Sequence, residues 1–255
     1  LVEQKGFNKE EALKEFMDYV HSYLGDDECD QIMKAFTLAD KAHEGQFRAS
    51  GEPYIMHPLA VADILAHLQI DHITLMAALM HDVVEDTSYS KEDLEEMFGS
   101  EVAFLVDGVT KLNQFQYETK EDRQMENYRK MILAMAKDVR VVVIKLGDRL
   151  HNMRTLKHMR SDKQKRIAKE TLEIFAPLAH RLGIFNVKWE LEDLSFRYLE
   201  PEKYYDLVDQ MKQKRQARED IVNDTMSQLT KALGEAHIKA DIKGRPKHFY
   251  SIYKK

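Results

Sequence analysis

The chain has 255 residues, 44% of them hydrophobic, which is enough for one large domain or two ordinary ones with a buried core. Its formal net charge of -6 argues against broad nucleic-acid binding, which normally requires a basic face. The single Cys29 excludes a disulfide framework, and no hydrophobic stretch approaches the roughly 20 residues that cross a bilayer, so we expect a cytoplasmic protein without membrane association.

The small numbers of prolines and glycines, 5 and 10, predict a mostly helical protein. Hydrophobic residues at helical spacing predict helices over residues 9–24 and 27–43. The segment GQFRASGEPYIMHP that follows is rich in turn residues and is typical of a functional loop. Because proline is favoured in the first turn of a helix, Pro58 predicts that His57 lies at the entrance of a helix over residues 58–68.

The segment HDVVEDTS, which begins at His81, ends a hydrophobic run with one imidazole and three carboxylates. On a helix, His81 would lie one turn from Glu85, and Asp82 would share a face with Glu85 and Asp86. Carboxylates at this spacing repel one another, and no Lys or Arg occurs between residues 51 and 90. A metal ion is therefore the first candidate partner, and a helix end whose acids point into water is the simpler alternative.

The elements around this segment are also predicted to be helical. We expect Thr74 to cap the helix that runs into the cluster. Ser90 and the aspartate three residues later predict a capping box that opens a short helix ending before Gly99. Residues 101–112 predict another helix, and the polar residues 113–121 predict a loop beside the site.

Residues 137–156 contain a run of β-branched side chains that favours a strand. If the segment is instead a helix, a set of polar residues shares one face. These residues are Asp148, His151, Asn152 and Thr155. Because no partner strand is evident nearby, we predict a helix, although a polar surface stripe is the simpler interpretation of that face taken alone.

The rest of the chain predicts a long helical region. An amphipathic helix is expected over residues 162–182, and a second over residues 187–199 with Trp189 as a core anchor. Residues 202–233 predict one long helix whose charged middle is solvated. From His237 the pattern changes to a short alternating strand, a Gly-Arg-Pro turn and the start of a helix, as at the opening of another domain.

Two imidazoles and two carboxylates come from three separate predicted helices, at His57, His81, Asp82 and Asp148. The adjacent His-Asp pair is the signature of the HD phosphohydrolases, and the order His, His-Asp, Asp resembles their full ligand set. Mixed nitrogen and oxygen donors suit Mn, Fe or Zn better than Ca, and four protein ligands leave positions open for water. The chemistry implied is phosphoester hydrolysis.

A closer resemblance, to the long bifunctional Rel/Spo alarmone enzymes, extends over essentially the whole chain. It is carried by the motifs AHEGQFRASGEPYIMHPLAVA, HDVVEDT, KLGDRLHNMRTL, ETLEIFAPLAHRLG and GRPKHFYSIYKK. Those enzymes degrade and make guanosine tetra- and pentaphosphate in the stringent response. The resemblance implies an all-α HD-domain bundle over residues 1–183, a helical connector over 184–236 and the truncated start of a synthetase domain, a short α/β stub, over 237–255.

The resemblance also implies roles for the clustered residues. Positions matching His57, His81, Asp82 and Asp148 hold the metal, usually Mn²⁺, with Zn²⁺ or Fe²⁺ less favoured. The pair matching Glu85 and Asp86 positions or activates the water that attacks the 3′-pyrophosphate, giving GDP or GTP and pyrophosphate. A carboxylate one turn beyond two ligands suits a general acid or base.

Further matches concern the nucleotide. Arg48 matches a basic residue beside the guanine, where a guanidinium stacks on the base, and Ser50, Asn152 and Thr155 match positions that contact the nucleotide. Many relatives carry a second basic residue where this chain has Ala49, so the phosphate contacts on that side are expected to differ.

The terminal motif matches the opening of the synthetase domain. Arg245, Lys247, Ser251 and Lys255 align with residues that hold the donor ATP, and basic side chains beside a turn suit a triphosphate. The acidic residues that bind magnesium and activate the acceptor lie beyond the last residue, so we expect no alarmone synthesis from this piece. Regulators such as the ribosome are expected to act through C-terminal parts of a longer protein.

Three other functions stay open from the residues alone. Another HD enzyme, such as a nucleotidase or cyclic-nucleotide phosphodiesterase, would use the same metal on a different substrate. A non-catalytic sensor would bind guanosine polyphosphate without metal-dependent turnover. A purely structural scaffold would leave the His-Asp cluster without a cation, which makes it the least favoured.

Overall fold

The computed structural model describes residues 8–113, 135–212, 215–242, 244 and 247–255, with the isolated positions 129 and 133. Among these residues the regular secondary structure is helical, and the extended backbone is limited to one isolated bridge between Phe47 and Pro53. This confirms the predicted all-α class. The predicted loop over residues 113–121 lies, apart from its first residue, outside the described residues.

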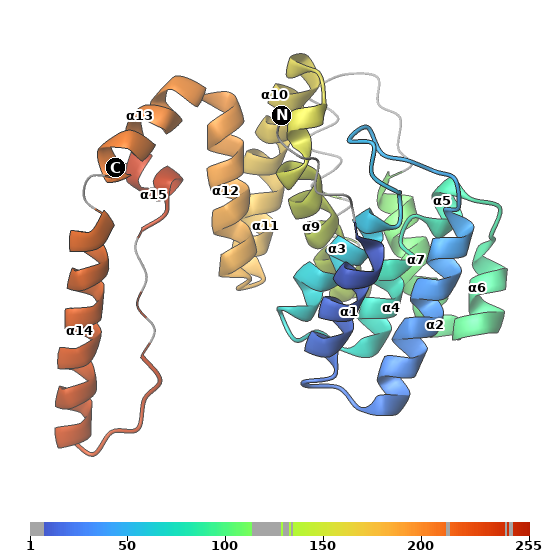
Figure 1. Cartoon of the computed structure of the whole chain (residues 1–255), viewed down its shortest axis with the longest axis horizontal. Helices are drawn as coiled ribbons and strands as arrows, with labels where there is room; N and C mark the ends of the chain where they lie inside the picture. The colour runs from blue at the N-terminus through green and yellow to red at the C-terminus, as the bar shows by residue number, and fades with distance from the viewer. Residues whose placement is uncertain are drawn as a thin grey trace.

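The first part of the chain forms a bundle at one end of the molecule (Figure 1). Its helices are α1 (Lys9–Val20), α2 (Asp26–Ala42), α3 (Met56–Ala66), α4 (His72–Leu79), α5 (Val83–Asp86), α6 (Lys91–Phe98) and α7 (Ser100–Asn113). The predicted capping box is confirmed, because Ser90 and Asp93 bond each other's backbone N–H groups at the start of α6. Gly99 follows α6 with a φ of 87°, a left-handed conformation that glycine adopts at little cost.

The second part continues from the bundle to the opposite end of the molecule, where the C-terminus lies beside α13 and α15 (Figure 1). Its helical segments are α9 (Val139–Arg154), the 3-10 turn η1 (Leu156–His158), α10 (Ser161–Glu170), the π-helical turn η2 (Thr171–Phe175), α11 (Ala176–Arg181), α12 (Phe185–Leu199), α13 (Pro201–Lys212), α14 (Arg215–Glu235) and α15 (Phe249–Tyr253). The predicted helix over residues 162–182 is thus one helical stretch with a π turn in it.

Helix α9 lies between two hydrophobic clusters. Val143 and Ile144 belong to the cluster formed with α1 to α7, whereas Val142 and Leu146 belong to the cluster formed with α10 to α12. A helix that is buried on opposite sides needs hydrophobic residues all round. This explains why a run of β-branched residues is helical here, and it confirms the helix predicted over residues 137–156.

The helix that was expected to run from Thr74 into the His-Asp cluster is interrupted. Asp71, rather than Thr74, caps α4, and its carboxylate accepts a hydrogen bond from the backbone N–H of Thr74 at 3.0 Å. The helix ends at Leu79, a turn follows, and the short α5 begins at Val83. A tight turn and a helix both bring residues three and four positions apart close together. The spacing of the residues therefore did not reveal the break between α4 and α5.

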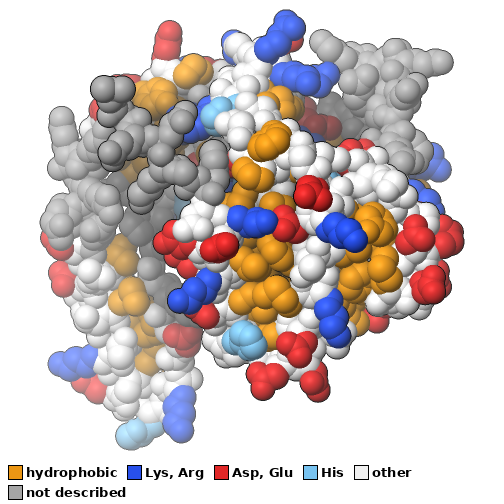
Figure 2. Space-filling model, turned by 45° about the vertical axis from the view of Figure 1, so that its right-hand side comes forward, with side chains coloured by type: hydrophobic (Ala, Val, Ile, Leu, Met, Phe, Trp, Pro, Cys, Tyr) orange, Lys and Arg blue, Asp and Glu red, His pale blue; other side chains and the backbone are white. Residues whose placement is uncertain are grey.

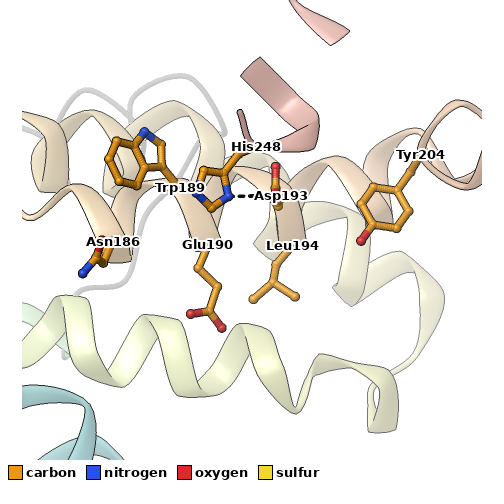
Figure 3. A pocket seen from close by; sticks show the side chains of 7 residues that line it. All are labelled: Asn186, Trp189, Glu190, Asp193, Leu194, Tyr204 and His248. Carbon is orange, nitrogen blue, oxygen red and sulfur yellow. Dashed lines mark hydrogen bonds and ion pairs between the residues drawn. The ribbon is translucent and has the colours of Figure 1, made fainter. Parts of the chain in front are cut away.

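Three expectations for the second part are wrong. Residues 202–233 do not form one helix, since α13 and α14 run in different directions (Figure 1). The strand expected after His237 is not formed by the described residues there, and an isolated strand has no partner to bond its backbone. Trp189 is only half-buried and lines a surface pocket instead of the core (Figure 3).

The start of the C-terminal helix α15 is capped by one carboxylate of α12. Asp193 accepts hydrogen bonds from the backbone N–H groups of Tyr250 at 2.8 Å and Phe249 at 3.4 Å, and lies 3.3 Å from Nδ1 of His248 (Figure 3). The ring of Trp189 stacks on His248 with centroids 5.2 Å apart. Asp193 therefore satisfies N–H groups that the first turn of a helix leaves unpaired.

Replacing Asp193 by alanine is expected to loosen α15 without disturbing the bundle. Losing a helix cap costs about 0.5–2 kcal/mol, so amide exchange in residues 249–253 should accelerate roughly two- to thirtyfold. Hydrogen exchange read by mass spectrometry measures this, with Asp206→Ala on the exposed face of α13 as control. Unchanged protection of α15 would mean that the aromatic contacts alone hold it.

The described surface carries charges of both signs. Figure 2 shows acidic and basic side chains interspersed on one face, among strips of hydrophobic side chains. Positive charge is not gathered into one patch on this face, in keeping with the formal net charge of -6. Among the described residues, no helix has the length and hydrophobicity to span a membrane.

Candidate metal centre

Three metal-binding side chains from different parts of the chain meet in the interior. His57 lies in the first turn of α3, His81 in the turn after α4, and Asp148 on α9, and all three are buried. One donor atom of each lies within 4.8 Å of the other two. Helices α3 and α9 can approach closely because Gly147 has no Cβ. A Cβ at this position would lie only 3.2 Å from Leu65 Cδ2. The group could therefore hold a divalent metal ion.

Asp82, the fourth predicted ligand, lies beside this group without belonging to the set of three. Its Oδ2 is 3.2 Å from Nε2 of His81 and 3.6 Å from Nε2 of His57. Nε2 of His57 is also 3.4 Å from Oδ1 of Asp148. The structure thus brings the four side chains together around the two Nε2 atoms.

His81 presents Nε2 to this space because its other nitrogen is occupied. Nδ1 lies 2.7 Å from the carbonyl oxygen of Ala78, to which it donates, and Nε2 is buried without a hydrogen-bond partner. Burial alone would lower the pKa of His81, but the carboxylates of Asp82 and Asp148 raise it to about 9. Nε2 is therefore the atom that takes either a proton or a cation.

The two buried carboxylates are ionised. Burial would raise the pKa of both, but His81 holds the pKa of Asp82, and Lys145 that of Asp148, well below the usual range. Burial lowers the pKa of His57, in spite of Asp148, so its imidazole is neutral. Two anionic and two imidazole donors in a buried site fit a divalent cation, whose charge offsets that of the carboxylates.

Arg48 and Asn152, predicted to contact the nucleotide, also brace this group. Arg48 Nη2 donates to Oδ1 of Asn152 at 2.6 Å, and Asn152 Nδ2 donates to Oδ1 of Asp148. Arg48 Nη1 lies 3.0 Å from Nδ1 of His151, which lies 2.7 Å from Nδ1 of His57. The sequence predicts His151 on the polar face of its helix but not as a site residue. Its position three residues after Asp148, on the same face of the helix, is the signal that indicates a place in the site.

The predicted catalytic pair lies on α5, at the surface. Glu85 and Asp86 are both exposed, and Asp86 Oδ2 is 2.8 Å from the hydroxyl of Tyr54. The same hydroxyl lies 2.8 Å from Oδ2 of Asp82. Burial and the Asp82 charge raise the pKa of Tyr54, so the hydroxyl keeps its proton, and its single O–H hydrogen is shared between the two carboxylates. Sequence reasoning missed Tyr54, although it lies in the loop three residues before His57.

The remaining predicted nucleotide contacts differ in their availability. The hydroxyl of Ser50 is buried without a hydrogen-bond partner, whereas Thr155 donates to the carbonyl of His151 at 3.0 Å. Ala49 is exposed. The hydroxyl of Ser50 therefore has no bond to lose on binding a nucleotide. The hydroxyl of Thr155 would have to give up its bond to the carbonyl of His151 before it could donate to a nucleotide.

The predicted ATP-binding residues lie elsewhere. Lys247, Ser251 and Lys255 belong to the segment around α15, at the opposite end of the molecule from the bundle (Figure 1). Lys247 and Lys255 are exposed, and Arg245 lies outside the described residues. The structure therefore does not bring Lys247, Ser251 and Lys255 to the candidate metal centre.

Residues 35–185 match the family model described as "HD domain". The helical bundle, the buried His-His-Asp group and this match agree, and the chain belongs to the HD-domain family. Like the all-α class, the predicted HD-type bundle is thereby confirmed.

Within that family the chain is a homologue of the Rel/Spo proteins. It is 50% identical over 234 residues to the Escherichia coli K12 protein named "Bifunctional (p)ppGpp synthase/hydrolase SpoT", covering 92% of this chain and 33% of that protein. It is 51% identical over 239 residues to "GTP pyrophosphokinase" of Myxococcus xanthus, covering 92% of this chain and 32% of that protein. The chain thus spans about a third of the length of these curated relatives.

A solved structure is also similar. Its description reads "A metazoan ortholog of SpoT hydrolyzes ppGpp and plays a role in starvation responses". The TM-score is 0.50 and the sequence identity 31%, and the match covers 66% of this chain and 94% of the other. The similarity therefore includes the fold of a solved relative, and the description of that relative says that it hydrolyses ppGpp.

Proposed function

We propose that this chain removes the 3′-pyrophosphate of guanosine tetra- and pentaphosphate, producing GDP or GTP and pyrophosphate. The observation that carries the proposal is the buried group of His57, His81 and Asp148, whose donor atoms lie within 4.8 Å of one another. The names of the relatives supply the substrate, since several are called guanosine-3′,5′-bis(diphosphate) 3′-pyrophosphohydrolases.

His57, His81, Asp82 and Asp148 would hold the metal, and we propose Mn²⁺ in preference to Zn²⁺ or Fe²⁺. The orphaned Nε2 of His81 and the two ionised carboxylates support a divalent cation in this position. When bound, such an ion lowers the pKa of water and offsets negative charge on a phosphate oxygen.

The exposed pair on α5 supplies the proton transfers in this proposal. The Glu85 carboxylate accepts the proton of the attacking water, and Asp86, held by Tyr54, keeps the pair in place. Water attacks the phosphorus atom attached to the ribose 3′-oxygen, the bond between that oxygen and the pyrophosphate breaks, and the oxygen takes up a proton to become the 3′-hydroxyl of GDP or GTP. For these proton transfers Glu85 and Asp86 need access to solvent and substrate, which their exposure on α5 provides.

Arg48 is suited to the guanine base. Its guanidinium donates to His151 and Asn152, which would hold the planar group in place for stacking on the base. The buried hydroxyl of Ser50 has no hydrogen-bond partner and would bond the nucleotide in this proposal, with Asn152 and Thr155 as further contacts.

We also propose a domain organisation for the whole chain. Residues 1–183 form the hydrolase domain, 184–236 a helical connector, and 237–255 the opening of a synthetase domain without alarmone synthesis of its own. The free, buried thiol of Cys29 supports a cytoplasmic location, and regulators such as the ribosome would act through other regions of a longer protein. Pyrophosphoryl transfer from ATP to GDP by this chain would contradict the assignment.

A substrate panel tests the function. Protein stripped by a chelator and reloaded with Mn²⁺ is given guanosine tetraphosphate, GTP, GDP and cyclic GMP, and the products are separated by ion-exchange chromatography. We expect GDP and one equivalent of pyrophosphate from the tetraphosphate alone. Preferential turnover of cyclic GMP or GTP would favour another HD phosphohydrolase, and binding of the tetraphosphate without turnover would favour a sensor.

Metal affinity is expected to rise with pH. The pKa of His81 is raised from 6.5 to about 9, so in the metal-free protein the imidazole is protonated at pH 7 and must lose that proton to bind a cation. The affinity for Mn²⁺ should therefore increase by about tenfold per pH unit from pH 7 and level off above pH 9. Calorimetry in buffers of different ionisation enthalpy should detect about one proton released per ion at pH 7. An affinity that is constant over this range would show that His81 is neutral before the metal binds.

A further inference from the structure

One side chain in the centre belongs neither to the proposed ligands nor to the proposed nucleotide contacts. His151 lies on α9, half-buried, one turn beyond Asp148. Its Nδ1 is 2.7 Å from Nδ1 of His57 and 3.0 Å from Nη1 of Arg48. Its ring is tilted by 38° against that of His57, so the contact joins the two nitrogen atoms and is not a stacking contact.

The chemistry of the three groups determines where the protons are. A guanidinium only donates hydrogen bonds, so Arg48 requires Nδ1 of His151 to be unprotonated and to accept. Because Nδ1 of His151 has no hydrogen, the contact with His57 forms only if Nδ1 of His57 donates, and the single lone pair of His151 Nδ1 is then shared between the two donors. In a neutral imidazole the hydrogen on Nδ1 leaves the lone pair on Nε2.

That lone pair is directed at the carboxylates. Nε2 of His57 lies 3.4 Å from Oδ1 of Asp148 and 3.6 Å from Oδ2 of Asp82. A lone pair facing two anionic oxygens is unfavourable unless a cation lies between them. The tautomer selected by His151 is therefore the one that can bind a metal together with both carboxylates.

We propose that His151 is a positioning residue of the metal centre, which fixes the tautomer and ring orientation of His57 so that Nε2 is free to bind the cation. The inference rests on the proposed metal-dependent function. A backbone carbonyl does the same for His81, where Ala78 accepts from Nδ1 at 2.7 Å. For His57 the partner of Nδ1 is a side chain, and Arg48 in turn fixes the protonation of that side chain.

Two substitutions separate this role from simple packing. His151→Phe keeps an aromatic ring but removes the acceptor, whereas His151→Asn offers an amide oxygen close to the place of Nδ1. We expect the affinity for Mn²⁺, measured by calorimetry on chelated protein, to fall about 10- to 100-fold in His151→Phe and to stay within about threefold in His151→Asn. Circular dichroism checks that both variants fold.

Nitrogen NMR of histidine-labelled, metal-free protein reads the tautomer directly. The signals of His57 are assigned by their loss in His57→Gln. We expect the hydrogen on Nδ1 in the wild type and in His151→Asn, and a mixture of tautomers in His151→Phe. An unchanged tautomer and unchanged metal affinity in His151→Phe would overturn the proposal, as would equal losses in both variants.

The same experiments distinguish this inference from the proposed function. If the wild type binds Mn²⁺ and His151→Phe behaves like it, only the role of His151 is overturned. If the wild type does not bind Mn²⁺, the metal centre fails and the role of His151 fails with it. If the two variants differ as expected but guanosine tetraphosphate is not hydrolysed, the role of His151 is supported and the substrate is wrong.

Discussion

Replacing Asp148 by asparagine is expected to remove Mn²⁺ binding and to lower hydrolysis of guanosine tetraphosphate by about a thousandfold, because a metal ion supplies several kcal/mol to such a reaction. The substitution removes one of the two negative charges of the centre and replaces a carboxylate oxygen of the three-residue group by a neutral amide oxygen or nitrogen. It also leaves Lys145, which is paired with this carboxylate, facing an uncharged amide. Steady-state kinetics and calorimetry on the same samples measure both effects.

Asp107→Asn is the matched control. It makes the same chemical change on α7, where the carboxylate is paired with Lys111 one turn later, away from the proposed ligands. Activity and metal binding are expected to stay at the wild-type level. Retention of a tightly bound ion in Asp148→Asn would mean that the cation lies elsewhere.

Changing Glu85 to glutamine is expected to separate catalysis from metal binding. Loss of a general base typically lowers kcat by about 10²- to 10⁴-fold. The affinity for Mn²⁺ should change by no more than about threefold, because Glu85 is exposed on α5 and lies outside the buried donor set. Kinetics at saturating substrate and calorimetric titration with Mn²⁺ give the two numbers.

The exposed Glu92 on α6 provides the control, and Glu92→Gln should leave both quantities unchanged. A parallel loss of metal and activity in Glu85→Gln would reassign Glu85 as a ligand. An unchanged kcat would instead shift the proton transfer to Asp86, which Tyr54 holds by a hydrogen bond.

The helical architecture could be predicted because hydrophobic spacing and local caps act over short distances. The capping box at Ser90 and the helix around Asp148 are found as expected, the latter because α9 is buried on opposite sides. The break between α4 and α5 was not predicted, since the residues of a tight turn follow almost the same short-range spacing as those of a helix. Nor does a local pattern reveal that α13 and α14 change direction.

The approach of His57, His81, Asp82 and Asp148 was expected from the order of motifs and not from any local rule. Contacts made by partners far apart in the chain were not foreseen. His151 touches a residue 94 positions away, and the Tyr54 hydroxyl contacts carboxylates 28 and 32 positions away. Which nitrogen of an imidazole carries the proton depends on such partners, and periodicity contains no information about them.

Titration of stripped protein with Mn²⁺, with pyrophosphate release followed at each step, shows whether hydrolysis depends on the metal. We expect no hydrolysis of guanosine tetraphosphate before the first addition, a linear return of activity, and a plateau at one ion per chain. Full activity in protein shown by elemental analysis to contain no metal would overturn the proposed metal centre.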